Sequence, residues 1–81
     1  HDVEVRFDKN AAGLVTETNW HPTQKTTTRK DGSVTLTFQV DGLDEIVWWI
    51  LAWTGRVEVI RPTELRKLVA EKLQEALKHY G

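Results

Sequence analysis

Apolar and polar residues alternate along three stretches of the chain, with the period of a half-buried strand. The alternation covers residues 3–7, 34–40 and 57–60, and the second stretch is the longest. The polar, threonine-rich residues 23–30 fit a strand only at the edge of a sheet or mostly in solvent. Because Asp and Gly at positions 31–32 favour a two-residue turn, the polar stretch and the strand after it are predicted to form a hairpin.

Helical spacing of apolar residues predicts three helices. Asp8 is a good N-cap for a short, weak helix over residues 10–17. A second helix is predicted over residues 43–53, where one face holds Leu43, Ile46, Val47 and Ile50. Pro62 opens a long final helix. Its recurring apolar residues are Leu65, Leu68, Val69, Leu73, Ala76, Leu77 and Tyr80.

The predicted order is strand, helix, two strands, helix and strand, followed by the extra helix. Strands on either side of a helix connect as right-handed crossovers, and the middle pair forms a hairpin. The arrangement that meets both conditions is an α+β fold, the ferredoxin-like βαββαβ sandwich. It has a four-stranded antiparallel sheet with helices on one face, and here a C-terminal helix is added. A chain of 81 residues is enough for one domain, over 1–81, and too short for two.

Composition excludes several classes of protein. The chain has no cysteine, which removes disulfide scaffolds and thiolate metal sites and agrees with a reducing cytoplasm. Its net charge of −1 argues against direct DNA binding, because phosphate neutralisation supplies most of the affinity of duplex binders. No apolar run approaches the roughly 20 residues that span a bilayer, so no membrane partner is expected. The chain begins at His1 and has no methionine, and we interpret it as a fragment of a longer protein, in which His1 is a candidate for an added residue.

Five short segments stand in order along essentially the whole chain, at residues 5–8, 20–24, 31–36, 49–53 and 57–65. Together they resemble the WCX domain, the C-terminal extension of WYL-domain transcription regulators. The first half carries three of them, at residues 5–8, 20–24 and 31–36. In the second half, the Trp-Ile-Leu-Ala-Trp of residues 49–53 is similar to the family's Trp-Leu-Leu-small-aromatic helix end. Residues 57–65 are similar to its Val-x-Val-Leu-x-Pro-x-Glu-Leu junction between strand and helix.

The resemblance implies that the chain is the C-terminal regulatory and dimerisation domain of a bacterial, cytoplasmic WYL-family helix-turn-helix transcription regulator. The implied partners are the upstream WYL and winged helix-turn-helix domains, a second copy in a homodimer, and a nucleotide or oligonucleotide effector. DNA is then contacted only through the missing N-terminal domain, and no cofactor is implied. The chain departs from the family at residues 54–55, where many members have Gly-Pro or Gly-Gly, so this loop is expected to differ in shape.

Tryptophan is unusually frequent, with four copies, and Trp48, Trp49 and Trp53 lie close together in the sequence. Trp53 flanks the apolar face of the predicted helix and Trp49 lies near its border, so both fit the core or the space under the last helix. Trp48 points away from that face, and with Trp49 it forms a candidate contact surface. Leu77 and Tyr80 of the last helix are the other candidates for contact with a partner chain, although the mixed charges of that helix also suit an ordinary solvated face.

Basic residues near the polar edge strand and the fourth strand are candidates for contact with the phosphates of an effector. They are Lys25, Arg29, Lys30 and Arg56. The other interpretation is a solvated edge whose charges prevent pairing with another sheet. The histidines have no metal-ligand spacing, so no metal site is predicted, and His21 is expected to be a structural residue at a corner.

Other functional classes find less support in the sequence. An RNA-binding module of this topology needs aromatic residues on the open face of its strands, where this chain has charged residues, threonine and glutamine. An acylphosphatase-like enzyme needs a glycine-rich phosphate loop with an arginine, and residues 8–12 have neither. No enzymatic activity is therefore predicted. The alternative that stays open is a free-standing small-molecule sensor that binds its ligand at a dimer seam.

Overall fold

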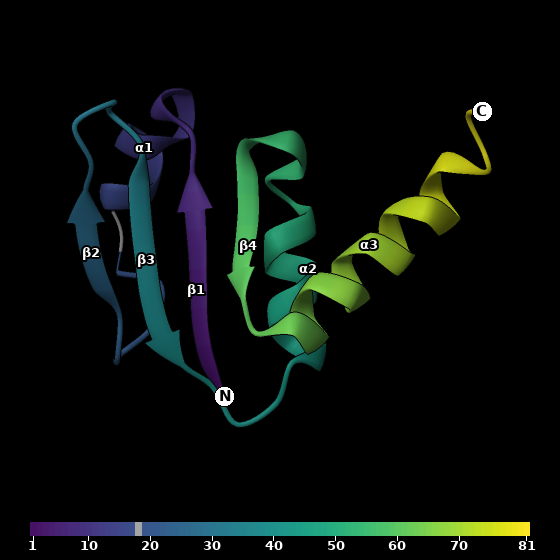
Figure 1. Ribbon diagram of the computed structural model, residues 1–81, viewed down its shortest axis with the longest axis horizontal. Coiled ribbons are helices and arrows are strands. Elements are labelled where there is room, and N and C mark those ends of the chain that lie inside the picture. The colour runs from purple at the N-terminus through teal and green to yellow at the C-terminus, as the bar shows by residue number, and fades with distance from the viewer. Residues whose placement is uncertain (18) are drawn as a thin grey trace.

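Four strands form one antiparallel sheet in the order β2-β3-β1-β4 (Figure 1). The computed structural model describes residues 1–17 and 19–81. In it, the strands are β1 (Asp2–Phe7), β2 (Lys25–Thr28), β3 (Val34–Gln39) and β4 (Val57–Arg61). The threonine-rich β2 lies at an edge and is exposed along its whole length, which confirms the prediction of a polar edge strand.

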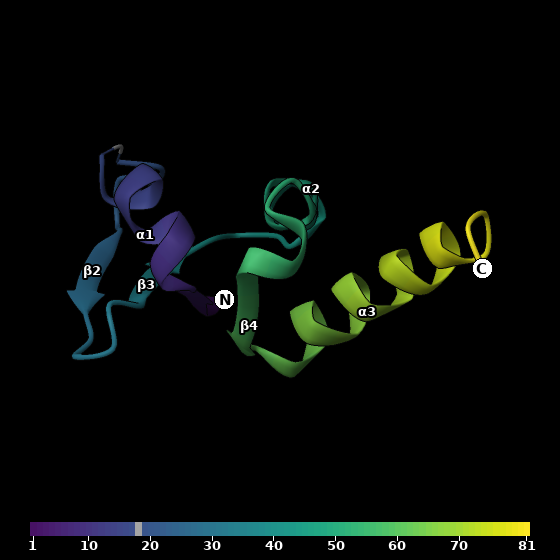
Figure 2. The same ribbon diagram turned by 90° about the horizontal axis from the view of Figure 1, so that it is seen from above.

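Three α-helices accompany the sheet, namely α1 (Lys9–Thr16), α2 (Asp44–Leu51) and α3 (Thr63–Leu77). Seen from above, α1 and α2 lie over the same face of the sheet, and α3 leaves from the β4 edge (Figure 2). These elements confirm the predicted α+β class, the four-stranded antiparallel sheet and the C-terminal helix.

Asp8 caps α1 as the sequence predicts. Its carboxylate accepts hydrogen bonds from the backbone N–H groups of Asn10, at 3.0 Å, and Ala11, at 2.9 Å. These bonds satisfy two of the donors that the first turn of a helix leaves without an intrahelical partner.

The second helix is shorter than predicted, because it ends at Leu51 rather than at Trp53. The N–H of Trp53 bonds three residues back, in a tight turn, and Thr54 then adopts a φ of 53°. A right-handed helix does not continue through a residue in this left-handed region. A short 3₁₀ turn over Thr54–Arg56 leads from there into β4.

The core lies between the covered face of the sheet and the helices. Val3, Val5 and Phe7 of β1 are buried there, as the alternation predicts. The other buried apolar side chains come from every element except β2, and from the residue before α2; they are Ala11, Val15, Val34, Leu36, Phe38, Leu43, Val47, Ile50, Val59 and Leu65.

The open face of the sheet carries polar contacts between strands. Thr35 was expected to face solvent, but it is buried, because Arg29 lies beside it and donates its Nε–H to the threonine hydroxyl at 2.8 Å. On the same face, Arg61 pairs with Glu4 at 3.2 Å. These contacts cover the face without any aromatic side chain among them.

The last helix projects from the domain as an arm (Figures 1 and 2). Leu65 is its buried residue, and Leu68 and Val69 pack partly against the core. Farther along, Leu73 and Leu77 are 48% and 64% exposed. Within residues 1–17 and 19–81, no helix has both the length and the apolar character needed to cross a membrane.

Candidate functional site

A cluster of aromatic side chains fills the space between α2 and the segment that follows α1. Phe7 lies at its base, edge-on to Trp49 at 5.7 Å and to Trp53 at 5.1 Å between ring centroids. Trp20 meets the same two indoles, at 5.7 Å and 6.0 Å. These tilted and edge-to-face arrangements are the ones that aromatic pairs favour. They confirm that Trp49 and Trp53 pack against the core.

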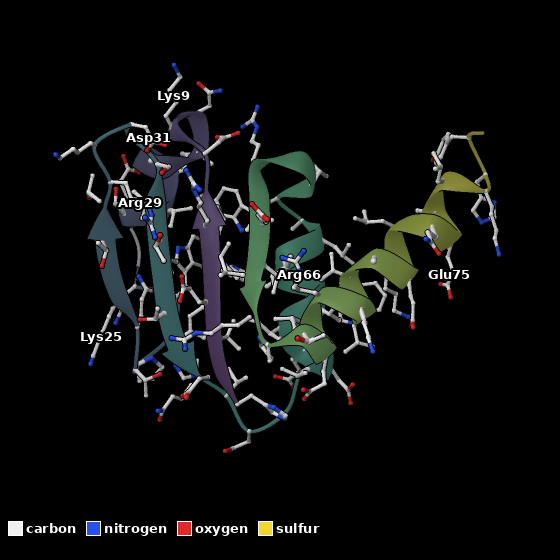
Figure 3. All side chains as sticks on the ribbon, viewed as in Figure 1. Lys9, Lys25, Arg29, Asp31, Arg66 and Glu75 are labelled. Atoms are coloured by element: carbon white, nitrogen blue, oxygen red, sulfur yellow. The ribbon has the colours of Figure 1, made fainter. Side chains whose placement is uncertain are left out.

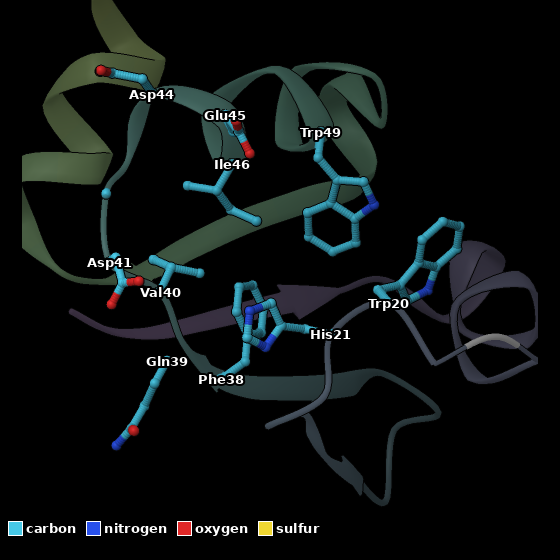
Figure 4. Close-up of a pocket in the computed structure, with 11 residues that line it drawn as sticks. Trp20, His21, Phe38, Gln39, Val40, Asp41, Asp44, Glu45, Ile46 and Trp49 are labelled. Carbon is cyan, nitrogen blue, oxygen red and sulfur yellow. The ribbon is translucent and has the colours of Figure 1, made fainter.

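A cavity of about 690 Å³ opens beside this cluster, over the end of β3 (Figure 4). From α2, Ile46 and Trp49 point toward His21 and Phe38, and Trp20 stands at one end of the space. The lining residues are Trp20, His21, Phe38, Gln39, Val40, Asp41, Gly42, Asp44, Glu45, Ile46 and Trp49.

Hydrogen bonds hold the Trp20 end of the cavity in place. The indole Nε1–H of Trp20 donates to the Val15 carbonyl at 3.1 Å, and its backbone N–H donates to the Gln24 side chain at 2.8 Å. The first bond ties the segment to the end of α1, and the second closes it into a turn. Trp20 is thereby fixed over the aromatic cluster, although 41% of it is exposed.

His21 is a structural residue at this corner, as predicted. Its ring stacks on Phe38 with centroids 5.6 Å apart, and its Nδ1 lies 2.9 Å from the Thr23 hydroxyl. The backbone N–H of Thr23 donates to the same Nδ1 at 3.2 Å. The Thr23 hydroxyl in turn accepts from the Gln39 N–H at 2.9 Å, which ties the corner to β3.

The charges that line the cavity are acidic. Asp41, Asp44 and Glu45 belong to its lining, which includes no lysine or arginine among the described residues. Asp44 and Glu45 lie in the first turn of α2, where the helix dipole favours negative charge. Figure 4 shows the carboxylates of Asp41 and Glu45 beside the cavity and Asp44 farther out.

One polar atom in the cluster lacks a partner. The Nε1–H of Trp49 is buried and makes no hydrogen bond to any residue that the structure describes. In Figure 4 this edge of the indole turns toward Trp20, while its six-membered ring faces the cavity. The Trp49 side chain therefore presents an apolar surface to a ligand in the cavity.

The structure separates the predicted interface residues. Trp48 is 60% exposed, and the ammonium of Lys72 lies 5.2 Å from the centroid of its ring. Leu77 and Tyr80 lie on or just past the outer half of α3, where Tyr80 is 89% exposed. Trp49, predicted together with Trp48, instead faces the cavity. Exposure thus suits Trp48, Leu77 and Tyr80 for contact with a partner, and this contact stays a prediction.

The predicted phosphate contacts are spread over the sheet. Lys25 and Arg29 lie toward opposite ends of the β2 edge, as Figure 3 shows, and Lys30 follows Arg29 in the turn. Arg56 precedes β4, at the other edge. Arg29 already bonds to Thr35, and none of the four belongs to the described lining of the cavity. A phosphate contact by these residues stays a prediction.

Sequence reasoning did not find the cavity. Asp44 and Glu45 fall in the helix predicted over residues 43–53, and Phe38 falls in the strand predicted over residues 34–40. The signal that the sequence offered for a binding site is the position of three acidic residues between Phe38 and Trp49. A helix that starts next to two aromatic residues brings carboxylates close to aromatic rings. In the part of the chain that the structure describes, no three acidic or histidine side chains gather to hold a metal ion.

Comparison with known proteins places the chain in a family. A search of curated proteins finds no match. The family model of the WCX domain matches residues 1–77, which is nearly the whole chain and includes every segment that carries the resemblance. The chain therefore belongs to the WCX domain family.

Proposed function

We propose that this domain is the C-terminal regulatory and assembly module of a WYL-type helix-turn-helix transcription regulator in the bacterial cytoplasm. Membership of the WCX family supports the regulatory context. The proposed partners are the upstream WYL and winged helix-turn-helix domains of the same protein and a second copy of the chain. DNA is bound through the helix-turn-helix domain, and this domain contributes no catalysis.

The proposed architecture is the ferredoxin-like sandwich. The order β2-β3-β1-β4 with antiparallel neighbours supports it, because β3 lies between β1 and β2, and β1 lies between β3 and β4. Two interleaved βαβ units produce this alternation. The placement of α1 and α2 over one face agrees with the same architecture (Figure 2).

The observation that carries the assembly role is an apolar stripe on the arm. Leu73, Leu77 and Tyr80, which we call the α3 stripe, are 48%, 64% and 89% exposed. A spacing of four residues places Leu73 and Leu77 on one face of α3, and Tyr80 lies in the turn just past its end. At its inner end the stripe meets a groove of about 420 Å³ between β4 and α3, to which Val57, Val69 and Leu73 contribute.

An apolar surface of this kind marks a contact site in a water-soluble domain. The proposed occupant is the α3 stripe of a second copy, since a two-fold arrangement lets one self-complementary surface cover another. Trp48 provides a second exposed surface, on α2. The cation–π contact with Lys72 holds its ring beside α3 rather than in the core.

Sedimentation equilibrium of the chain tests the assembly role. Leu77→Ser together with Tyr80→Ser is expected to convert a self-associating chain into a monomer, because the stripe loses most of its apolar area. The control is Glu71→Ser with Glu75→Ser, which changes the same number of residues on the opposite face of α3. A wild-type chain that is monomeric at every concentration, or a stripe variant that associates as tightly as the control, would contradict the proposal.

A nucleotide or oligonucleotide effector remains part of the proposal. The basic side chains that support it are Lys25, Arg29, Lys30 and Arg56. Because they are spread over both edges of the sheet, a single phosphate can contact only some of them. The contact is tested by measuring how effector affinity changes with salt concentration. If two of these basic residues bind phosphates, replacing them should make the affinity less dependent on salt.

A small-molecule sensor is the second candidate function, and the cavity favours it. A volume of about 690 Å³ lies in the range of ligand sites, about 300–1,000 Å³. The cavity lies within a single chain rather than at a dimer seam. The residues encoded upstream separate the candidates, since a helix-turn-helix followed by a WYL segment marks a regulator.

A further inference from the structure

We propose that the cavity beside the aromatic cluster binds a small organic cation with a flat, apolar body, such as an arylalkyl amine. This ligand acts as an effector only if the proposed regulatory role is correct. Ligand binding to the cavity and assembly through α3 are measured in separate experiments, so the result of one does not decide the other.

The walls of the cavity provide the recognition of a flat body. Trp20, Trp49 and Phe38 contribute aromatic surface, and Val40 and Ile46 add aliphatic surface. The hydrogen bonds of Trp20 and the edge-on contact of Phe38 with Trp49, at 6.0 Å, hold these rings in place before a ligand arrives. Preorganised rings bind a flat apolar body with little loss of side-chain entropy.

The charges of the cavity select the sign of the ligand. The cavity is lined by Asp41, Asp44 and Glu45. Among the described residues, none of these three forms an ion pair with Lys, Arg or His. These carboxylates are therefore open to a cationic ligand. Aromatic ring faces attract cations as well, so the walls and the rim favour the same charge.

His21 is the basic residue of the described lining, and its ring stacks on Phe38. Its Nδ1 lies 2.9 Å from the Thr23 hydroxyl and 3.2 Å from the Thr23 backbone nitrogen. A lysine or arginine on the rim would reverse the preference, and the described lining has neither. A phosphate-bearing ligand would be repelled by the carboxylates of the cavity. The cavity therefore suits a cationic ligand, and the basic edge strand suits an anionic one.

Helix stabilisation does not account for all of the acids. Asp44 and Glu45 are favourable in the first turn of α2, but Asp41 precedes the helix and does not cap it. The N-cap position is Leu43, which makes no side-chain capping bond. Figure 4 shows the Glu45 carboxylate next to Ile46 and the Asp41 carboxylate next to Val40, at the end of the cavity away from Trp20.

Isothermal titration calorimetry with three related probes tests the proposal. The probes are 2-phenylethylamine, 2-phenylethanol and 3-phenylpropanoate, which share a phenyl body and differ in charge. We expect the amine to bind about tenfold more tightly than the alcohol, and the carboxylate to bind more weakly than either. Equal affinities for amine and alcohol, or no saturable binding of the amine at millimolar concentration, would overturn the proposal.

Two matched variants identify the source of the preference. Asp41→Asn with Glu45→Gln is expected to reduce the preference for the amine, since Asp44 and the ring faces remain, and to keep the binding of the alcohol. Glu71→Gln with Glu75→Gln removes the same charge from α3 and should keep the full preference. If the first variant keeps the full amine preference, or if both variants lose it equally, the charge selection does not come from the cavity. Circular dichroism and the thermal midpoint show whether each variant is folded, and the alcohol reports on an intact cavity.

Discussion

Phe7 joins the sheet to the tryptophan side chains of α2. It is fully buried and lies edge-on to both Trp49 and Trp53. An 81-residue chain has a small core, so the loss of one such side chain is a large fraction of its stability. The aromatic cluster is thus both a wall of the cavity and a main part of the core.

Phe7→Leu is expected to lower the free energy of unfolding by about 2 kcal/mol, through lost ring contacts and an imperfectly filled site. Urea denaturation measures the change. Leu14→Ala, which trims an apolar side chain that is 55% exposed, is the control and should change stability by less than about 0.5 kcal/mol. Similar losses in the two variants would show that Phe7 does not hold the cluster together.

Asp31 provides a pH-dependent contribution to stability at the hairpin. Its carboxylate accepts the Ser33 hydroxyl at 2.6 Å and the Ser33 N–H at 2.9 Å, and it pairs with Arg6 at 3.0 Å. The bonds from Ser33, with help from Arg6, lower the pKa of Asp31 from 3.8 to about 2. Because the folded state binds the proton more weakly than the unfolded state, the carboxylate stabilises the fold above the unfolded pKa.

The stability difference between the wild type and Asp31→Asn should therefore be constant above a pH of roughly 5 and shrink as the pH falls toward about 2. Urea denaturation across this range measures it. Ser33→Ala removes the hydroxyl bond, the largest cause of the low pKa of Asp31, and should reduce the same dependence on pH. A difference that stays constant down to pH 2 would exclude Asp31 as its source.

At the scale of elements, the two edge strands are protected in different ways. β2 is short, exposed and polar, which makes it a poor template for another strand. β4 is more apolar, and its Val59 carbonyl accepts a hydrogen bond from Arg66 of α3 at 2.6 Å. The same guanidinium lies 3.7 Å from Glu58. α3 thus protects the edge from which it projects.

Arg66→Ala is expected to lower the free energy of unfolding by about 1 kcal/mol, the value of a partly exposed hydrogen bond to a charged donor. It should also promote aggregation, because the β4 edge loses its cover. Chemical denaturation and light scattering measure the two effects. Lys67→Ala, at the neighbouring exposed position, is the control, and equal behaviour of the two variants would show that Arg66 does not protect the edge.

The elements themselves were predictable because each is determined locally. Alternation located β1 and β3, and Asp8 located the start of α1. The end of α2 was not predictable, since residues 52–53 suit a helix, but the N–H of Trp53 bonds to Ile50 in a tight turn. The burial of Thr35 was missed for another reason, because it depends on Arg29 lying beside it on the open face.

At the scale of the whole molecule, the cavity was beyond local reasoning. The end of β3 and the first turns of α2 are close in the sequence, but the cavity is completed by Trp20 and His21 from the segment after α1, which is distant from them. Helical spacing did place Trp48 on the outside and Trp49 near the core. It did not show that Trp49 would meet Trp20, because that contact depends on how the segment after α1 folds back.

The arm formed by α3 has a consequence for how the domain responds to its neighbours. Leu73 and Leu77 of its outer turns are largely exposed, and an isolated helix of this length is marginal in water. We therefore expect a second copy that covers these residues to stabilise the outer turns. The inner turns contact both β4 and α2, and the first residues of α2 line the cavity, so α2 connects the arm to the cavity.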